Sequence, residues 1–462
     1  MLNAKSIAES STAETSHAKV AVTGVPSAFG RYPAAVKAGG LIFTSGQRGP
    51  AAEVTFEDMP REGRGKAQGF GAADQDEETV AVSSWRAHAA LEATLAAAGS
   101  ATDQILRQHV WQRDKRFFPV YEAIRRHWQP TPAPSSGLGV ADLGDADQAW
   151  LGLDAIAVAA DAPAPFGPRS VVAAVDHRAL PSASHYSQAV RTGPLIFTAG
   201  HIPIKTSEPG KPVVKAYEDV PEEGRQLATG RSHPDSRDGP IAAQTWFVYK
   251  ELEKLLAHAG CTLEDTVLST VYLADLRDLA VFHRVHRQFF PNGGPALCVS
   301  AFNEVGHRGC SIEIELTVLD PKSDMKREAV AWPVRAPLDA PAAVRCGDFV
   351  FLSGMAAFDD TGRVRAPAGS ETGSDAELAA QTRLTFQRLA ETLKAAGGGL
   401  ADLTKLTVYL RTNEEFDTFE QVAGEVLPAA SLPALEVVPI TGPGPVQAAR
   451  IQLEGIAYIR NA

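Results

Sequence analysis

The chain has 462 residues, 44% of them hydrophobic, and a formal net charge of −11. At about 150 residues per domain, this length predicts about three domains and is too long for one hydrophobic core. The acidic balance argues against a nucleic-acid partner, which needs a basic face to displace counterions. The apolar runs fall short of the roughly 18 residues that cross a bilayer, so we expect no membrane partner.

Residues 1–18 are rich in Ser, Thr, Ala and Glu and lack the apolar stretch of a signal peptide. We therefore expect a disordered tail there. The four cysteines are sparse and none shows Cys-x-x-Cys spacing, which is typical of a reduced compartment. These features together predict a cytoplasmic protein.

One strand motif recurs at a fixed period. Phe43, Phe197 and Phe351 follow one another at intervals of 154 residues, inside the segments 41–46, 195–200 and 349–354, and each segment ends in glycine. Self-similarity at a fixed spacing is the signature of a duplicated unit. The sequence therefore predicts one domain written three times, and a functional site has to be compared copy against copy.

Each copy shows the same order of predicted elements. A hairpin with a glycine turn includes the motif strand, and a long helix that stops before a glycine follows. A strand, a second helix and two closing strands complete the copy, which predicts an α+β layer with one sheet and two helices on one face. The two helices of each copy are expected at 79–98 and 118–128, at 242–259 and 279–290, and at 376–396 and 416–427. The domains are expected at 19–160, 170–322 and 333–462.

The best-kept motifs stand in copy two. They are Tyr186-Ser187-Gln188-Ala189-Val190, Phe197-Thr198-Ala199-Gly200, Ala243-Gln244-Thr245, Ala259-Gly260 and Glu313-Ile314-Glu315. With this set the chain resembles the RidA/YjgF family of reactive-intermediate deaminases, and the weaker matches in the other copies extend the resemblance over nearly the whole chain after about residue 25.

The resemblance implies chorismate-mutase-like domains, three of which pack their sheets into a central barrel with ligand clefts between neighbours. We therefore expect three tandem RidA-type α+β domains, each a mixed sheet with two helices on one face, that form an intramolecular pseudo-trimeric barrel. The chain would be a monomeric pseudo-trimer or a higher homo-oligomer of it. Three separate domains that trimerise with other chains are the alternative.

The resemblance also implies a site that this chain has altered. Family deaminases hydrolyse imines or enamines, and an arginine in a Pro-Ala-Arg motif grips the substrate carboxylate with its planar fork. That position holds Ser136, Leu297 and Leu435 here. The substrate therefore lacks this carboxylate or is held otherwise, for example by Arg64 or Arg225 of an insertion shared by copies one and two.

The water-positioning glutamate of the family maps to Glu313, whereas copies one and three have Gly152 and Gln452. A buried carboxyl group whose pKa rises toward neutrality can act as a general base. A strand residue in a salt bridge is the alternative reading of Glu313. Copy two is therefore the best candidate for chemistry.

The resemblance places an aromatic lid at Tyr186 and Tyr32. A position on the second helix, Asn in many family members, holds Glu122, His283 and Glu420. These titratable groups could transfer protons, or they could lie on a solvated helix face.

The remaining candidates lie at strand ends. Ala199 and Gly200 close the motif strand, Leu297 and Cys298 stand at the lost arginine position, and all four are expected to contact substrate. His201 follows the motif strand and is a further acid–base candidate, which could share a cleft with the other titratable groups or face a neighbouring copy.

The pair His283-x-x-His286 has helical spacing but no third ligand at a proper spacing, so we expect no metal.

The sequence thus predicts a cofactor-independent enzyme that acts on a small imine, enamine or enol-like metabolite. Proton transfer with water addition or elimination would make it a hydrolase of the deaminase type or a lyase. One alternative is a non-catalytic module that binds a metabolite or a protein. The other is a chorismatase-like hydrolase, because those enzymes share the trimeric barrel.

Overall fold

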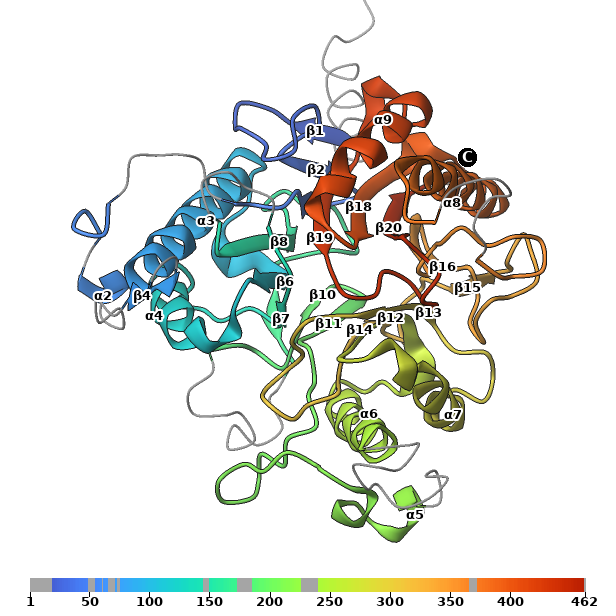
Figure 1. Cartoon of the computed structure of the whole chain (residues 1–462), viewed down its shortest axis with the longest axis horizontal. Coiled ribbons are helices and arrows are strands. Elements are labelled where there is room, and N and C mark those ends of the chain that lie inside the picture. The colour runs from blue at the N-terminus through green and yellow to red at the C-terminus, as the bar shows by residue number, and fades with distance from the viewer. Residues whose placement is uncertain are drawn as a thin grey trace, which may run out of the picture.

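The structure is a computed structural model that describes residues 19–48, 55–59, 61–64, 71–72, 75–143, 149–172, 185–225, 240–364 and 372–460. The tail expected at residues 1–18 lies outside these ranges. Three six-stranded sheets, one for each copy, lie around the middle of the molecule, and the long helices lie outside them (Figure 1).

The first sheet has the strand order β1-β2-β3-β8-β6-β7. Its strands are β1 (Val20–Val22), β2 (Ala35–Ala38), β3 (Leu41–Thr44), β6 (Ile105–Gln112), β7 (Ser135–Gly139) and β8 (Leu151–Val158). The helices of this copy are α2 (Arg61–Arg64), α3 (Glu77–Ala97) and α4 (Phe118–Trp128), and a short ribbon of β4 (Gly71–Ala72) and β5 (Gln75–Asp76) precedes α3.

The second sheet repeats this order as β9-β10-β11-β14-β12-β13. Its strands are β9 (Ser170–Val171), β10 (Ala189–Thr192), β11 (Leu195–Thr198), β12 (Thr266–Leu273), β13 (Ala296–Ala301) and β14 (Ile312–Leu319). The helices are α5 (Glu222–Arg225), α6 (Ile241–His258) and α7 (Leu279–Phe289).

The third sheet has the order β15-β16-β17-β20-β18-β19. Its strands are β15 (Arg327–Val330), β16 (Ala343–Cys346), β17 (Phe349–Leu352), β18 (Leu403–Leu410), β19 (Ala434–Pro439) and β20 (Ile451–Tyr458), and its helices are α8 (Asp375–Ala395) and α9 (Phe416–Val426). The sheet includes β15, which precedes residue 333.

Each sheet is mixed because one strand pair is parallel, namely β6 with β7, β12 with β13, and β18 with β19. A parallel pair needs a crossover, and the second helix of the copy supplies it. The hairpin of each motif turns at a glycine with positive φ, of 55° at Gly39, 50° at Gly193 and 60° at Gly347, where L side chains are disfavoured. The three tandem α+β units predicted from the sequence are confirmed.

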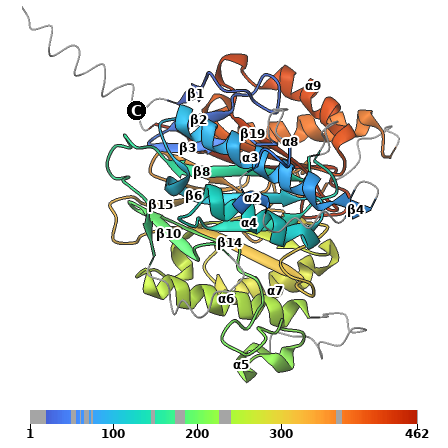
Figure 2. The same ribbon diagram turned by 90° about the vertical axis from the view of Figure 1, so that its left-hand side faces the viewer.

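The inner faces of the three sheets share one apolar cluster. The repeated phenylalanines Phe43, Phe197 and Phe351 all belong to it, and each is at most 1% exposed. Burial of such a side chain stabilises a fold by about 1.5–3 kcal/mol. The central strands β8 and β14 are buried along their whole length, because helices cover one face of each sheet and the other sheets cover the opposite face (Figure 2).

The copies meet at three seams that use the same backbone contact. The glycine N–H that ends each motif strand donates to the lost-arginine strand of the preceding copy. Gly200 donates to Ser135 (3.3 Å) at the 1–2 seam, Gly354 to Leu297 (3.1 Å) at the 2–3 seam, and Gly46 to Leu435 (2.9 Å) at the 3–1 seam. Each copy thus contacts both others, while a continuous closed barrel stays a prediction.

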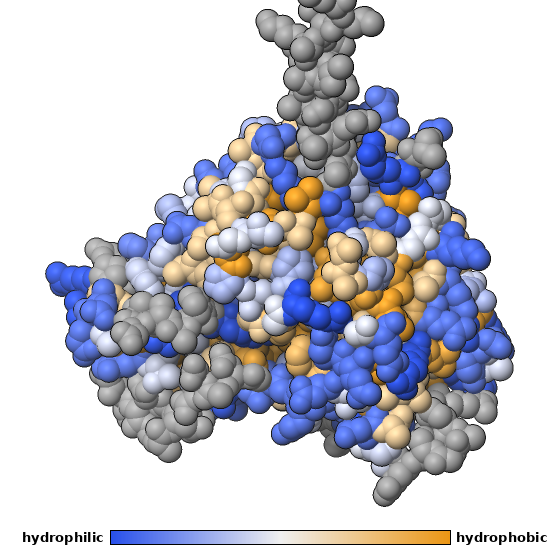
Figure 3. Space-filling model, turned by 90° about the horizontal axis from the view of Figure 1, so that it is seen from above, coloured by the Kyte–Doolittle hydropathy of each residue, from blue (hydrophilic) through white to orange (hydrophobic). Residues whose placement is uncertain are grey.

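Hydrophilic residues cover much of the face shown in Figure 3, and apolar residues gather toward its middle. Within the described ranges, none of the helices combines the length and apolar character needed to span a membrane.

Candidate active site

The 1–2 seam holds a cavity of about 660 Å³. Copy one contributes Lys115, Tyr121 and Arg125 to its lining, and copy two contributes Tyr186, Gly200 and Glu313. A cavity of several hundred Å³ with a few converging polar groups is typical of a small-molecule site.

Glu313 lies directly over the glycine that ends the motif strand. A Cβ atom placed on Gly200 would lie 1.9 Å from Oε1 of Glu313, so only glycine leaves room for this carboxylate. The other carboxylate oxygen, Oε2, accepts a hydrogen bond from the N–H of Gly306 at 3.2 Å. The strand β14 and the loop before it therefore hold the carboxyl group at one position in the cavity.

Burial raises the pKa of the Glu313 carboxyl group to about 7. The nearby Glu315 raises it too, whereas Lys115, the N–H of Gly306 and His109 act in the opposite direction. A carboxyl group with a pKa near the working pH can take up and release a proton in turn.

Lys115 reaches the cavity from the turn between β6 and α4. Its ammonium Nζ donates to the carbonyl oxygen of Gly137 at 2.5 Å, and its backbone N–H donates to Oε2 of Glu304 at 3.0 Å. Burial lowers the pKa of Lys115, while Glu313 and Glu304 raise it. Lys115 and Glu313 interact electrostatically across the seam without forming an ion pair.

Two further polar groups line the cavity. The buried guanidinium of Arg125 donates from Nη1 to Oγ of Ser135 and from Nη2 to the carbonyl of Ala133, both at 3.0 Å. Tyr186 is a neutral phenol at ordinary pH, because burial and the neighbouring Glu313 raise its pKa.

The 2–3 seam has an amide at the equivalent position. The side chain of Gln452 takes the place of Glu313 and lies over Gly354, where an added Cβ would approach its Oε1 to 2.6 Å. Its Nε2 donates to Oγ of Ser300 at 2.7 Å and lies 3.2 Å from Sγ of Cys298. An amide held in this way cannot act as a base.

The 3–1 seam has an ion pair at the position of Glu313. Gly152 has no side chain there, and Arg48 occupies the space, because an added Cβ would lie 2.3 Å from its Nη1. Arg48 pairs with Glu436, which lies over Gly46 and is fully buried. This seam therefore has a salt bridge where the 1–2 seam has the Glu313 carboxyl group.

The lost-arginine positions have taken on contacts between copies. Oγ of Ser136 donates to the carboxylate of Glu315. Leu297 and Leu435 accept the seam hydrogen bonds through their backbone carbonyls and are themselves buried. The family's substrate-binding arginine is thus replaced at these three positions by residues that form contacts between copies.

The titratable residues on the second helices lie against the lid segments. Oε1 of Glu122 accepts the N–H of His185 at 3.1 Å, next to the lid residue Tyr186. Oε2 of Glu420 accepts the hydroxyl of Tyr32 at 2.8 Å, and its Oε1 pairs with Arg31. Each carboxylate therefore joins the second helix of one copy to the lid segment of the next.

Several other predicted site residues lie away from the cavity. His283 faces a separate hollow that Asp339 also lines, and Nδ1 of His201 contacts the carbonyl oxygen of Ala199 at 3.0 Å. None of Glu122, His283, Glu420 and His201 is among the described residues that line the 1–2 cavity. Their catalytic roles stay predictions.

Cys298 is buried at the 2–3 seam, and burial raises its pKa well above the ordinary value, with Glu454 contributing. Arg225, a sequence-based candidate for holding a carboxylate, donates instead to the backbone carbonyls of Val220 and Glu218. Arg64, the other such candidate, lies over the ring of Phe56. Across the described ranges there is no group of three acidic, His or Cys side chains placed to hold a metal ion.

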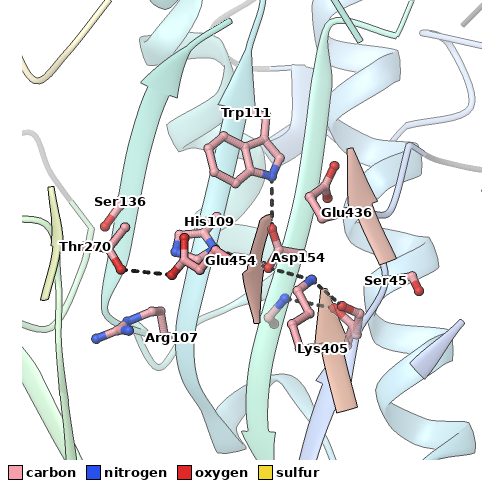
Figure 4. A network of polar contacts seen from close by, with 12 residues as sticks. Ser45, Arg107, His109, Trp111, Ser136, Asp154, Thr270, Lys405, Glu436 and Glu454 are labelled. Carbon is pink, nitrogen blue, oxygen red and sulfur yellow. Dashed lines mark hydrogen bonds and ion pairs between the residues drawn. The ribbon is translucent and has the colours of Figure 1, made fainter. Parts of the chain in front are cut away.

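A polar network in the centre of the molecule was missed by the sequence reasoning (Figure 4). The second acid of the Glu-Ile-Glu motif recurs as Asp154, Glu315 and Glu454, and this recurrence was the available signal. His109 lies between Asp154 (3.2 Å) and Glu315 (3.0 Å), and Lys405 pairs with Asp154 at 3.1 Å. Burial lowers the pKa of His109, but the two carboxylates outweigh it and raise the pKa to about 10.

Glu454 is held by hydroxyl groups. Thr270 donates to its Oε1 at 3.0 Å and Tyr409 to its Oε2 at 2.8 Å. Thr270 belongs to copy two, so this acid also links two copies. The network joins all three copies by charged or polar contacts.

Comparison with known proteins agrees with this architecture. The model of a family described as "Endoribonuclease L-PSP" matches residues 177–319 and 336–459, more than half of the chain. A RutC family protein of Pyrococcus abyssi is 34% identical over 111 residues, which are 24% of this chain and 68% of that protein. A RutC family protein of Saccharolobus solfataricus is 30% identical over 140 residues, which are 30% of this chain and 87% of that protein.

Shorter and more distant likenesses were also found. The 3-aminoacrylate deaminase RutC of Acinetobacter baylyi is 33% identical over 58 residues, which are 13% of this chain and 46% of that protein. Among solved structures, RidA of an Antarctic Psychrobacter is 26% identical, with a TM-score of 0.24 and coverage of 29% of this chain and 100% of that one. A chorismatase is 13% identical, with a TM-score of 0.45 and coverage of 77% and 93%. The chain therefore belongs to the RidA/YjgF family, whose α+β domain it carries as three tandem, divergent copies.

Proposed function

We propose that the chain is a cofactor-independent hydrolase that deaminates an imine or enamine in the cavity of the 1–2 seam. The observation that carries this proposal is the Glu313 carboxyl group, which lies in that cavity with a pKa near 7 because it is buried. The name of the RutC relative, a 3-aminoacrylate deaminase, favours the same class of reaction.

The proposed reaction adds water across a carbon–nitrogen double bond. Glu313 takes a proton from water while the oxygen attacks the imine carbon, and the same carboxyl group delivers this proton to the nitrogen. Glu313 then transfers the hydroxyl proton of the resulting carbinolamine to the nitrogen as the carbon–nitrogen bond breaks, which releases ammonia and a carbonyl compound. The neutral hydroxyl of Tyr186 is suited to donate a hydrogen bond to the substrate.

Substitution of Glu313 by Gln tests the proposal. The imine is produced in situ from an amino acid by an amino-acid oxidase, and its decay and the release of ammonia are followed. We expect E313Q to lose about 100-fold or more of kcat, the range that a general base contributes. The matched control is E420Q at the 3–1 seam, which should keep its activity.

The panel of imines should include both 2-iminopropionate and the imine of phenylalanine. We expect weak turnover of 2-iminopropionate, since the family's carboxylate-binding arginine is replaced in all three copies. Full activity in E313Q, or no turnover of any imine by the wild type, contradicts the proposal and favours a non-catalytic binding module.

The chorismatase-like alternative is less favoured by the charges of this cavity. Its substrate carries two carboxylates, and the cations of the 1–2 seam share the lining with Glu304 and Glu313, which offset part of their positive charge.

The same proposal includes a single-chain assembly in the cytoplasm. All three seams form within one chain, so the protein needs no second copy to build the cavity. Sedimentation should then give the mass of one chain, 49.0 kDa. Two relatives from fission yeast are named as mitochondrial proteins, and that statement concerns those proteins alone.

A further inference from the structure

The cavity of the 1–2 seam includes a basic residue that does not recur in the other two copies. Lys115 stands where copy two has Leu276 and copy three has Asn413, so it is present at one seam only. It lines the cavity together with Glu313, which belongs to the other copy. The seam therefore combines a cation from copy one with a carboxyl group from copy two.

The ammonium of Lys115 retains capacity to bind a ligand. It has three N–H donors, and among the described residues it has one hydrogen-bond acceptor, the carbonyl of Gly137. Its backbone is fixed by the bond from its N–H to Glu304. Since Lys115 and Glu313 interact but form no ion pair, ligand atoms can lie between them.

The charges around Lys115 favour an anion. Arg125 also lines the cavity, but its guanidinium already donates to Ser135 and Ala133. Arg116 and Arg308 add two further cations to the lining, against the two acidic groups Glu304 and Glu313. A carboxylate can therefore lie against Lys115.

The walls of the cavity select an apolar body for the ligand. Phe118, Tyr121, Tyr186 and Ile202 contribute apolar surface. The hydroxyl of Tyr121 is buried, and within the described part of the chain no group forms a hydrogen bond with it. A polar atom of a bound molecule would give the Tyr121 hydroxyl a hydrogen-bond partner, and a buried hydroxyl without one is costly.

We propose that Lys115 binds the carboxylate of the substrate, and that the substrate class is a carboxylate with an apolar or aromatic tail and the reacting carbon beside Glu313. This inference deepens the proposed function, on which it rests for the reaction. Lys115, in the turn after β6, then binds the carboxylate, which Ser136 at the family's arginine position cannot bind. The carboxylate-binding residue therefore belongs to another element of the same copy.

Ligand binding tests this inference without requiring turnover. Titration calorimetry compares 3-phenylpropionate with its uncharged isostere 3-phenylpropionamide, and with inorganic phosphate. Wild-type protein should bind the carboxylate at least about tenfold more tightly than the amide, as expected for a charge-assisted hydrogen bond. Phosphate should bind more weakly than the carboxylate, because it has no apolar part to contact Phe118 and Ile202.

Variants of Lys115 assign the preference to this residue. K115M should bind both compounds equally, and K115R should keep the preference because it keeps the charge. K254M, on the exposed face of α6, is the matched control and should behave as wild type. Thermal melting of K115M checks that the variant folds.

Three outcomes overturn the inference: equal binding of acid and amide by the wild type, a preference retained in K115M, or no saturable binding of either compound. E313Q separates the inference from the reaction, since it should still prefer the carboxylate. If imine turnover fails while this preference persists, the proposed function fails and the binding site stands.

Discussion

At the scale of single residues, the absence of a side chain decides where a catalytic candidate can lie. Gly200 leaves space that the carboxylate of Glu313 fills, and Gly46 and Gly354 leave the same space at the other two seams. The occupant of that space differs between seams: an acid, an amide, or an acid paired with arginine. The conserved backbone contact therefore does not determine the chemistry, whereas the facing side chain does.

The ionisation of Glu313 predicts the pH dependence of turnover. The base must be deprotonated, and burial places its pKa near 7. We therefore expect kcat/KM to fall about tenfold per pH unit below 7 and to level off above about 8. Because Lys115 lowers the pKa of Glu313, the midpoint in K115M should move to higher pH. If kcat/KM stayed constant between about pH 5.5 and 8.5, the assignment of Glu313 as the base would be wrong.

At the scale of elements, the second helix of each copy holds the lid segment of the next one. Glu122 on α4 binds the N–H of His185, and Glu420 on α9 binds the hydroxyl of Tyr32. These contacts account for acidic residues at the two positions without assigning them a proton-transfer step. They also explain how copy one can influence the position of Tyr186, a residue of copy two.

Two variants of Glu122 distinguish clamping from catalysis. An amide still accepts the N–H of His185, so E122Q should keep most of its kcat. E122A removes the acceptor and should weaken substrate binding by about tenfold, in line with about 1.5 kcal/mol for a hydrogen bond to a charged group. Steady-state kinetics on both variants give the answer, with E420A at the other seam as the control. A loss of kcat of about 100-fold in E122Q would instead support a proton-transfer role.

Much of the fold was predictable because it repeats. The glycines of the turns, the alternation around the phenylalanines and the two helices recur three times, so each copy supports the reading of the others. The cavity was only partly predictable. Glu313 belongs to a recurrent motif, but Lys115 occurs in one copy, and Arg48 fills its seam by pairing with a residue 388 positions away. Sequence spacing does not indicate contacts of that kind.

At the scale of the whole molecule, the central network makes the three copies depend on one another. His109 of copy one bridges its own Asp154 and Glu315 of copy two, and Lys405 of copy three pairs with Asp154. Buried charges are costly unless they are paired, so the loss of one partner leaves the others exposed to that cost. The copies should therefore unfold together and not one after another.

The raised pKa of His109 predicts how stability varies with pH. The folded protein holds this proton up to about pH 10, whereas the unfolded chain releases it near 6.5. The contribution of His109 to the free energy of unfolding is therefore fully present below about 6.5 and is lost as pH rises toward 10. H109Q should melt at a lower temperature than wild type at pH 6, and the difference should shrink by pH 10. Melting curves at several pH values measure it, and a difference that grows with pH would refute the charge assignment.

Fusion of three units into one polypeptide has a consequence for how such a protein changes. In an assembly of identical subunits, every substitution appears at all interfaces at once, and a mutation that blocks one cleft blocks the rest. Here Arg48 and Gln452 each stand at a single interface, and Glu313 lines the cavity of the third. A substitution can therefore change one interface without changing the contacts of the other two.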